Sequence, residues 1–202
     1  TAVGFAMAAR FERGLLDPET PAGQSLFDHS IWVICSDGDL QEGVSAEASS
    51  LAGTQELGNL NVIYDDNRIS IEGDTHLAFT EDVSARYRAY GWSVIEVDTL
   101  ADGNVDLPAL DQAMREAKLD SRRPTLIRMK SVIAWPAPKL RNTAKSHGSA
   151  LGDAEIEATK VLLGLDPQEK FAMPEDVLNH IRLVKERGAS LRRDWDARFD
   201  LW

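Results

Sequence analysis

Residues 36–43 read SDGDLQEG, and residues 64–71 read YDDNRISI. An apolar run precedes each of these polar segments, namely residues 31–35 and residues 61–64. The stretch between them, residues 43–57, has apolar and small residues at helical spacing. Strand, polar turn, helix, strand and polar turn in this order predict a βαβ unit with two parallel strands.

The two polar turns are expected to lie at one edge of the sheet. In a βαβ unit both turns leave the carboxyl ends of parallel strands, which is where open α/β sheets bind ligands. Asp37 and Asn67 therefore come together although they are 30 positions apart (67 − 37). Each also has a simpler reading, because Asp is common at helix N-caps and Asn is common in turns.

The side chains of the two turns favour a divalent cation. A carboxylate from Asp37 and a carboxamide oxygen from Asn67 are hard ligands, which suit Mg²⁺ or Ca²⁺. Two side chains do not complete the coordination of either ion, so backbone oxygen, water and phosphate oxygens are expected as well. Gly38 lacks a Cβ and lets a phosphate approach the backbone, and free N–H groups at the start of a helix attract anions.

These segments resemble the thiamine diphosphate motif, and the residues around them resemble transketolases. The resemblance covers nearly the whole chain and is carried by DLQEG (39–43), SLAGT (50–54), YDDNRISI (64–71), RYRAYGW (86–92) and SHGSALG (146–152). One residue departs from the family pattern, because Ser36 stands where the first Gly of the motif is usual. A small residue still fits a tight turn there.

The resemblance implies a fold and an activity. It implies a doubly wound α/β fold, with a mostly parallel sheet and helices on both faces. It implies thiamine diphosphate- and Mg²⁺-dependent (or Ca²⁺-dependent) transfer of a two-carbon ketol group between ketose and aldose sugar phosphates, in the pentose phosphate pathway. It also implies a homodimer whose subunits share their active sites.

The resemblance also implies roles for individual residues. Asp37, Asn67 and the backbone oxygen of Ile69 are expected to hold the metal, and Asp37, Gly38 and Asn67 to bind the cofactor. His147 is expected to face the diphosphate and substrate as a catalytic proton carrier. Ile71 is expected to pack on the thiazolium ring of the cofactor. Glu42 and Glu47 are expected to lie at the dimer interface.

Simpler readings remain open for these further residues. Ile71 could pack in the core, and His147 could be a loop histidine bonded to backbone. Glu42 could be a first-turn acid favoured by the helix dipole. Glu47 could serve packing alone.

Composition excludes some classes of protein. The chain has 202 residues, a hydrophobic content of 43% and a net charge of -11. This acidic balance argues against a nucleic-acid surface, but not against an anionic cofactor held by a metal and backbone N–H groups. Cys35 is the single cysteine, so no internal disulfide can form, which favours a reducing, cytoplasmic compartment. No apolar run reaches transmembrane length, so no membrane partner is expected.

The remaining pattern predicts alternating strands and helices. Further strands are expected at 92–97 and 124–129, and further helices at 81–90, 108–119, 153–163 and from 174 onward. Residues 14–30 and 132–151 are expected to be loops, the second carrying His147. Residues 1–152 are interpreted as the core of a diphosphate-binding domain that is incomplete at its N-terminus. Residues 153–202 are interpreted as a helical appendage and linker toward a missing pyrimidine domain.

Two other functions remain open on the sequence alone. One is a related thiamine enzyme, of the dihydroxyacetone synthase or deoxyxylulose-phosphate synthase type. The other is a non-catalytic cofactor-binding module. In transketolases a glutamate on the pyrimidine domain of the other subunit activates the cofactor, so residues 1–202 are expected to be inactive alone.

Overall fold

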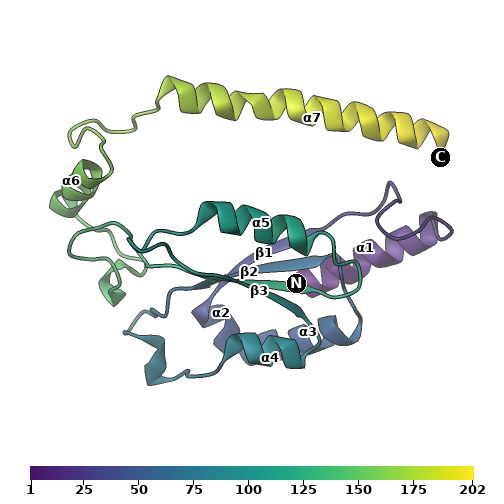
Figure 1. Cartoon of the computed structure of the whole chain (residues 1–202), viewed down its shortest axis with the longest axis horizontal. Helices are drawn as coiled ribbons and strands as arrows, with labels where there is room; N and C mark the ends of the chain where they lie inside the picture. The colour runs from purple at the N-terminus through teal and green to yellow at the C-terminus, as the bar shows by residue number, and fades with distance from the viewer.

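Four parallel strands form the centre of the molecule in the computed structural model, which describes all residues from 1 to 202 (Figure 1). The strands follow the sheet order β1-β2-β4-β3. Their bounds are β1 Ile31–Ser36, β2 Leu60–Asp66, β3 Ser93–Val97 and β4 Thr125–Lys130. Every neighbouring pair is parallel, as the predicted α/β fold requires.

Seven α-helices and two short 3₁₀ turns connect and extend the strands. The helices are α1 Ala2–Leu16, α2 Asp37–Gln41, α3 Gly43–Thr54, α4 Val83–Ala89, α5 Leu107–Ala117, α6 Asp153–Leu162 and α7 Glu175–Leu201. The 3₁₀ turns are η1 Thr75–Leu77 and η2 Ala144–Ser146. None of the helices combines the length and the apolar character that crossing a membrane would require.

Helices cover both faces of the sheet, as predicted. On one face, side chains from α1, α3 and α4 pack on the sheet around Leu60, Val62 and Leu126. On the opposite face α5 packs a smaller cluster against Val97 and Ile127 (Figure 1). Burial of this apolar surface is the main force that holds the layers together.

The long helix α7 stands apart from the sheet. It contains no buried residue, and it runs past α5 toward the end of α1 (Figure 1). Its C-terminal half is tied to the loop before β1. The indole Nε1 of Trp195 donates to the Leu26 carbonyl at 3.2 Å, Arg198 donates to the Gln24 carbonyl at 2.7 Å, and the Trp202 ring meets Phe27.

The polar turn at 36–43 contains a short helix that the sequence did not predict. The Asp39 carboxylate accepts the Ser36 N–H at 2.8 Å and the Ser36 hydroxyl at 3.1 Å. This bond from the third helical position back to the N-cap closes a capping box, and α2 begins at Asp37.

Several predicted boundaries were wrong. The helix from Gly43 ends at Thr54, before Leu57, and Gly58 does not stop it. A Cβ on Gly58 would lie 2.2 Å from the Ser121 carbonyl carbon, so glycine is needed there for close packing. The loop expected from residue 14 begins after Leu16, because α1 is longer than its apolar start suggested.

Candidate functional site

Asp37 lies where β1 ends and α2 begins, and its side chain connects the two polar turns. It is only 2% exposed. The Tyr64 hydroxyl donates to its Oδ1 at 2.6 Å, and the Arg68 N–H donates to its Oδ2 at 2.9 Å. Since Arg68 lies between Asn67 and Ile69, the structure brings the predicted pair of turns together at one edge of the sheet.

The Asp37 carboxylate is buried without a cation beside it. Burial raises the pKa of Asp37 above its usual value, against hydrogen bonds from Tyr64 and from the backbone N–H groups of Arg68 and Asn67, which lower it. No Lys, Arg or His forms an ion pair with this side chain. A bound cation would compensate such a charge, so the environment of Asp37 fits a metal ligand.

The turn after β2 presents oxygen atoms near Asp37. The Asn67 Oδ1 accepts the Ile69 N–H at 2.9 Å, and the Asn67 amide donates to Asp65 at 3.3 Å. Arg68 has a left-handed φ of 60°, which turns the chain sharply. The Ile69 carbonyl accepts no hydrogen bond and keeps both lone pairs.

These donors fit a hard cation better than a transition metal. No cluster of three or more His, Cys, Asp or Glu side chains that could hold a metal occurs in the structure. The predicted set uses one carboxylate, one carboxamide and one carbonyl, leaving positions for water and phosphate oxygens. Gly38 is exposed, and a Cβ on it would meet nothing within 4 Å, so there is open space for a diphosphate beside it. The N–H groups of Asp37 and Gly38 open α2 and have no partner within the helix.

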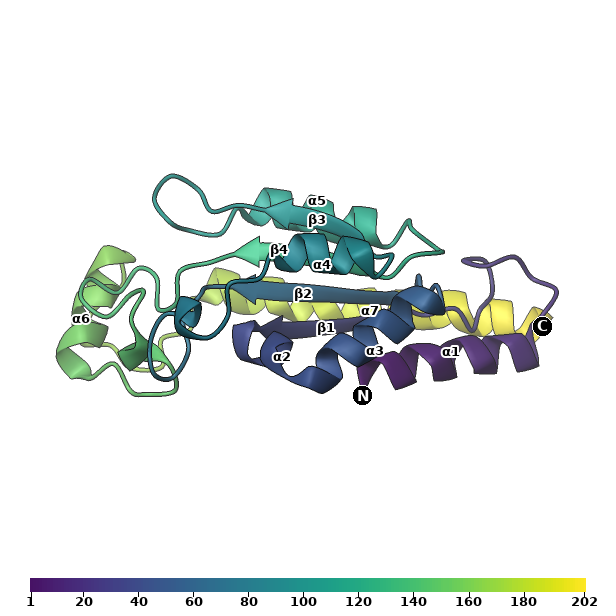
Figure 2. The same ribbon diagram turned by 90° about the horizontal axis from the view of Figure 1, so that it is seen from below.

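The other predicted site residues are solvent-exposed and do not contact Asp37. Ile71 follows the turn and is 70% exposed, which argues against core packing. His147 ends η2, where its N–H donates to the Ala144 carbonyl at 3.0 Å. Its loop and the loop after β2 lie at the same end of the sheet (Figure 2). Glu42 lies between α2 and α3, and Glu47 lies on α3.

A buried glutamate anchors the loop that carries His147. Glu155 is 8% exposed. Its Oε1 accepts the backbone N–H groups of Lys139 at 2.6 Å and Leu140 at 2.8 Å. The Leu140 carbonyl in turn accepts the Thr143 and Ser146 hydroxyls, both at 2.7 Å. The loop is therefore ordered by specific bonds, although it has almost no regular secondary structure.

A polar cavity of about 610 Å³ opens beside Asp37. Its lining includes Tyr64, Asp66, Glu96 and Arg128, none of which was predicted from the sequence to belong to the site. One signal in the sequence could have identified Arg128, because this charged residue interrupts the apolar residues Leu126, Ile127 and Met129 of β4.

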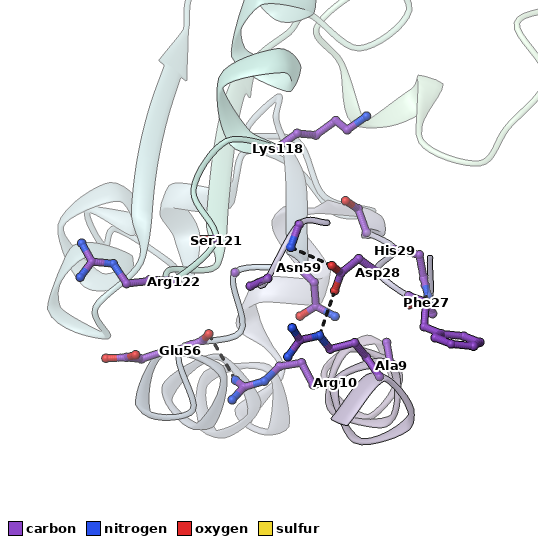
Figure 3. Close-up of a pocket in the computed structure, with 15 residues that line it drawn as sticks. Ala9, Arg10, Phe27, Asp28, His29, Glu56, Asn59, Lys118, Ser121 and Arg122 are labelled. Atoms are coloured by element: carbon purple, nitrogen blue, oxygen red, sulfur yellow. Dashed lines mark hydrogen bonds and ion pairs between the residues drawn. The ribbon is translucent and has the colours of Figure 1, made fainter. Parts of the chain in front are cut away.

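A second cavity, of about 560 Å³, involves none of the predicted site residues (Figure 3). Two of its three arginines, Arg10 and Arg13, already bind protein groups. Arg10 donates to the Gln55 carbonyl and, at 3.3 Å, to the Glu56 carbonyl, and Arg13 lies 3.7 Å from Asp28. These contacts tie α1 to the residues that follow α3 and to the loop between α1 and β1. The residues around this cavity therefore hold parts of the fold together.

Comparisons with known proteins agree with the geometry. The family model "Transketolase, thiamine diphosphate binding domain" matches residues 1–202. Over all of its 202 residues, the chain is 51% identical to the transketolase of Mycobacterium leprae and covers 28% of that protein. Over 198 residues, or 98% of its length, it is 43% identical to the chloroplastic transketolase of Zea mays and covers 28% of that protein.

Solved structures agree as well. A transketolase from Campylobacter jejuni superimposes with a TM-score of 0.88 at 39% identity, over 98% of this chain and 30% of that one. A transketolase from Pichia stipitis in complex with sedoheptulose-7-phosphate gives 0.88 at 38% identity, over 99% of this chain and 29% of that one. The chain thus spans less than a third of each of these relatives, and within that span it belongs to the family of transketolase thiamine diphosphate-binding domains.

Proposed function

We propose that residues 1–202 supply the diphosphate and metal site of a transketolase, which transfers a two-carbon ketol group between ketose and aldose sugar phosphates. The observation that carries the proposal is Asp37, a buried carboxylate without a cationic partner that is bonded to the turn of Asn67 and Ile69. The thiamine diphosphate-binding family and the transketolase relatives support the same cofactor and reaction.

The proposed metal is Mg²⁺, or Ca²⁺ in its place. Asp37 and the Asn67 side-chain oxygen would hold it together with the Ile69 carbonyl, and the N–H group of Gly38 would bind the diphosphate. When bound, thiamine diphosphate supplies a nucleophilic carbon and an electron sink for cleavage beside a ketose carbonyl. The residues of this chain anchor and orient the cofactor's diphosphate end.

The exposed residues at the same end of the sheet have roles that fit their positions. We infer that Ile71 offers an apolar surface to the thiazolium ring, which its 70% exposure leaves free. We infer that His147 carries a proton for the substrate, because an imidazole can both accept and donate a proton and this residue is exposed at that end of the sheet.

A homodimer contact through α2 and α3 is supported by exposed apolar side chains. Val44 is 69% exposed and Leu51 is 44% exposed. Together with Glu47 they lie at helical spacing on one side of α3, with Glu42 just before its start. We infer that a second subunit covers this surface and brings its own pyrimidine domain to the cofactor.

We infer that the chain has two parts with different roles. Residues 1–152 form the core of the diphosphate-binding domain, and residues 153–202 lead toward a pyrimidine domain elsewhere in the protein. The absence of buried residues in α7 supports this linker role. A cytoplasmic location and a role in the pentose phosphate pathway complete the proposal. The single, unpaired Cys35 supports a reducing compartment, and the transketolase name of the Mycobacterium leprae relative supports sugar-phosphate chemistry.

The alternative functions predict different results with substrates. A dihydroxyacetone synthase or deoxyxylulose-phosphate synthase would bind the same cofactor but prefer other donors or acceptors, and a non-catalytic module would turn over none. The Mycobacterium leprae and Zea mays relatives are named transketolases, which favours sugar-phosphate donors and acceptors. A panel of ketose and aldose sugar phosphates with the full-length protein separates these cases.

The decisive variant is Asp37→Ala in the full-length protein. Removing the cofactor and metal should abolish ketol transfer, and adding both should restore it in the wild type but not in the variant. Asp120→Ala is a matched control, because Asp120 also accepts backbone N–H groups in a turn, from Arg122 and Arg123, outside the proposed site. Ketol transfer by Asp37→Ala at the wild-type rate would contradict the proposed site.

A further inference from the structure

One row of the sheet places polar side chains next to Asp37. In the register of the parallel strands, Tyr64 of β2 lies opposite Arg128 of β4, which lies opposite Glu96 of β3. Cys35 of β1 completes the row on the other side of Tyr64. Strand neighbours in register project to the same face, so Tyr64, Arg128 and Glu96 line one polar path across the sheet.

The Tyr64 hydroxyl lies between two carboxylates. It is 2.6 Å from Oδ1 of Asp37 and 3.4 Å from Oδ1 of Asp66. A phenol has one hydrogen to donate, and the shorter contact assigns it to Asp37. The ring is held firmly, because Tyr64 is only 3% exposed and belongs to the main core cluster.

Two arginines pair with Asp66, the other carboxylate near the Tyr64 hydroxyl. Arg128 contacts Oδ2 of Asp66 through Nε at 2.7 Å and through Nη2 at 2.6 Å, and the Arg68 Nε lies 3.6 Å from its Oδ1. Glu96 lies 3.5 Å from Arg128 on the far side. Because Asp66 is already paired, the hydroxyl of Tyr64 remains directed at Asp37.

The result is a carboxylate fixed at both of its oxygens. Tyr64 holds Oδ1 of Asp37 and the Arg68 N–H holds Oδ2, so the carboxylate plane cannot rotate without breaking one of these bonds. Each carboxylate oxygen accepts one of these bonds and keeps further lone-pair capacity for another partner. Loss of the phenol hydrogen would remove the 2.6 Å bond to Oδ1 and leave the carboxylate held only by backbone N–H groups of the turn after β2.

We propose that Tyr64, kept in place by the Asp66–Arg128 pair, is a positioning residue that orients the Asp37 carboxylate for the metal and the diphosphate. This inference rests on the proposed function and adds to it a group that touches neither metal nor cofactor. Groups of this kind, which hold a metal ligand by hydrogen bonding, typically change metal affinity about 10–100-fold when removed.

Tyr87 provides a matched control within the same core. It is also 3% exposed and belongs to the same cluster, and its hydroxyl is likewise hydrogen-bonded, accepting from Ser49 at 3.0 Å. It makes no contact with Asp37. Replacing either tyrosine with phenylalanine removes one buried hydroxyl and leaves the ring, so a purely structural effect would be similar at both positions.

The test compares Tyr64→Phe with Tyr87→Phe in the full-length protein. Calorimetric titrations measure the affinity for Mg²⁺ at fixed thiamine diphosphate and for thiamine diphosphate at fixed Mg²⁺, and thermal unfolding is followed without either ligand. We expect Tyr64→Phe to weaken both affinities roughly tenfold or more, and Tyr87→Phe to leave them within about twofold. A raised Mg²⁺ concentration should restore cofactor binding to Tyr64→Phe.

Equal affinities in the two tyrosine variants would overturn the inference, whatever their unfolding temperatures. Asp37→Ala distinguishes this failure from failure of the proposed function. If Asp37→Ala loses metal-dependent binding while Tyr64→Phe keeps it, the site stands and the positioning role is wrong. If Asp37→Ala binds like the wild type, both the site and the positioning role are wrong.

Discussion

At the scale of single residues, Asp37 shows a conflict between stability and binding. A carboxylate that is 2% exposed and has no cationic partner carries a desolvation cost, which raises its pKa. A fold selected for stability alone would neutralise or pair such a group. Its presence at the carboxyl edge of a parallel sheet is what the proposed metal site explains.

Cys35 should be almost inert toward thiol reagents in the folded protein. Burial, reinforced by the charges of Asp39, Asp37 and Asp65, raises the pKa of its thiol to about 12. The reactive thiolate is therefore scarce near pH 8, and reaction with an aromatic disulfide reagent should be slow until denaturant exposes the side chain. The rate should rise with pH as the thiolate fraction grows. Fast reaction of the native full-length protein near pH 8 would contradict this account.

The sequence predicted part of this residue-scale arrangement. Asp37 and Asn67 could be placed together because both follow apolar strands of one βαβ unit. Tyr64 and Arg128 could not, because their contact depends on β4 lying beside β2, in the order β1-β2-β4-β3. Nothing in the spacing of the apolar runs encodes that order.

At the scale of elements, the loop before α6 depends on Glu155. Glu155→Ala would leave the Lys139 and Leu140 N–H groups without their charged acceptor, at a cost of about 1.5–3 kcal/mol for each bond. We expect faster hydrogen exchange in residues 139–147 and a lower rate of ketol transfer. Glu157→Ala is the control, since Glu157 is exposed on the same helix. Unchanged exchange in Glu155→Ala would show that the loop is ordered without this anchor.

The packing of α3 on the turn after α4 depends on a glycine. A Cβ on Gly53 would lie 1.8 Å from the Tyr90 carbonyl oxygen, so Gly53→Ala forces the two segments apart. We expect it to destabilise the protein by about 1–3 kcal/mol. Gly188→Ala, also in a helix but with nothing within 4 Å of the new Cβ, should instead gain about 0.5–1 kcal/mol from helix propensity. Denaturant unfolding of both variants checks the opposite signs, and equal effects would refute the packing argument.

Strands were easier to predict than helix ends. The apolar runs located β1 to within one residue at each end, and β2 to within one residue at its start and two at its end, because strands of parallel sheets are rich in apolar residues. The presence of α2 depends on a local capping bond from Asp39 to Ser36, a pattern that the sequence carries and that the prediction did not use. The chain after α3 turns through a left-handed Glu56, with a φ of 51°, and the close packing at Gly58 depends on the tertiary structure. The fold class could therefore be predicted, while the local geometry of the site could not.

At the scale of the whole molecule, the proposed site is only one side of a cofactor-binding site. The chain spans 28% of the Mycobacterium leprae relative, and its proposed cofactor contacts reach the diphosphate and the thiazolium ring but not the aminopyrimidine. Residues 1–202 produced alone should therefore bind thiamine diphosphate far more weakly than the full-length protein and show no ketol transfer. Calorimetry and a coupled assay on both proteins measure this difference. Clear ketol transfer by the isolated chain would refute the division of labour proposed for the domains.

The proposed site can be located experimentally from the position of the metal in a crystal of the full-length protein with thiamine diphosphate and Mn²⁺ in place of Mg²⁺. Anomalous scattering locates Mn²⁺ without assumptions about its ligands. We predict one peak within bonding distance of the Asp37 carboxylate, the Asn67 side-chain oxygen and the Ile69 carbonyl, next to the diphosphate. A peak held by other residues, or cofactor bound at this edge with no metal, would contradict the account.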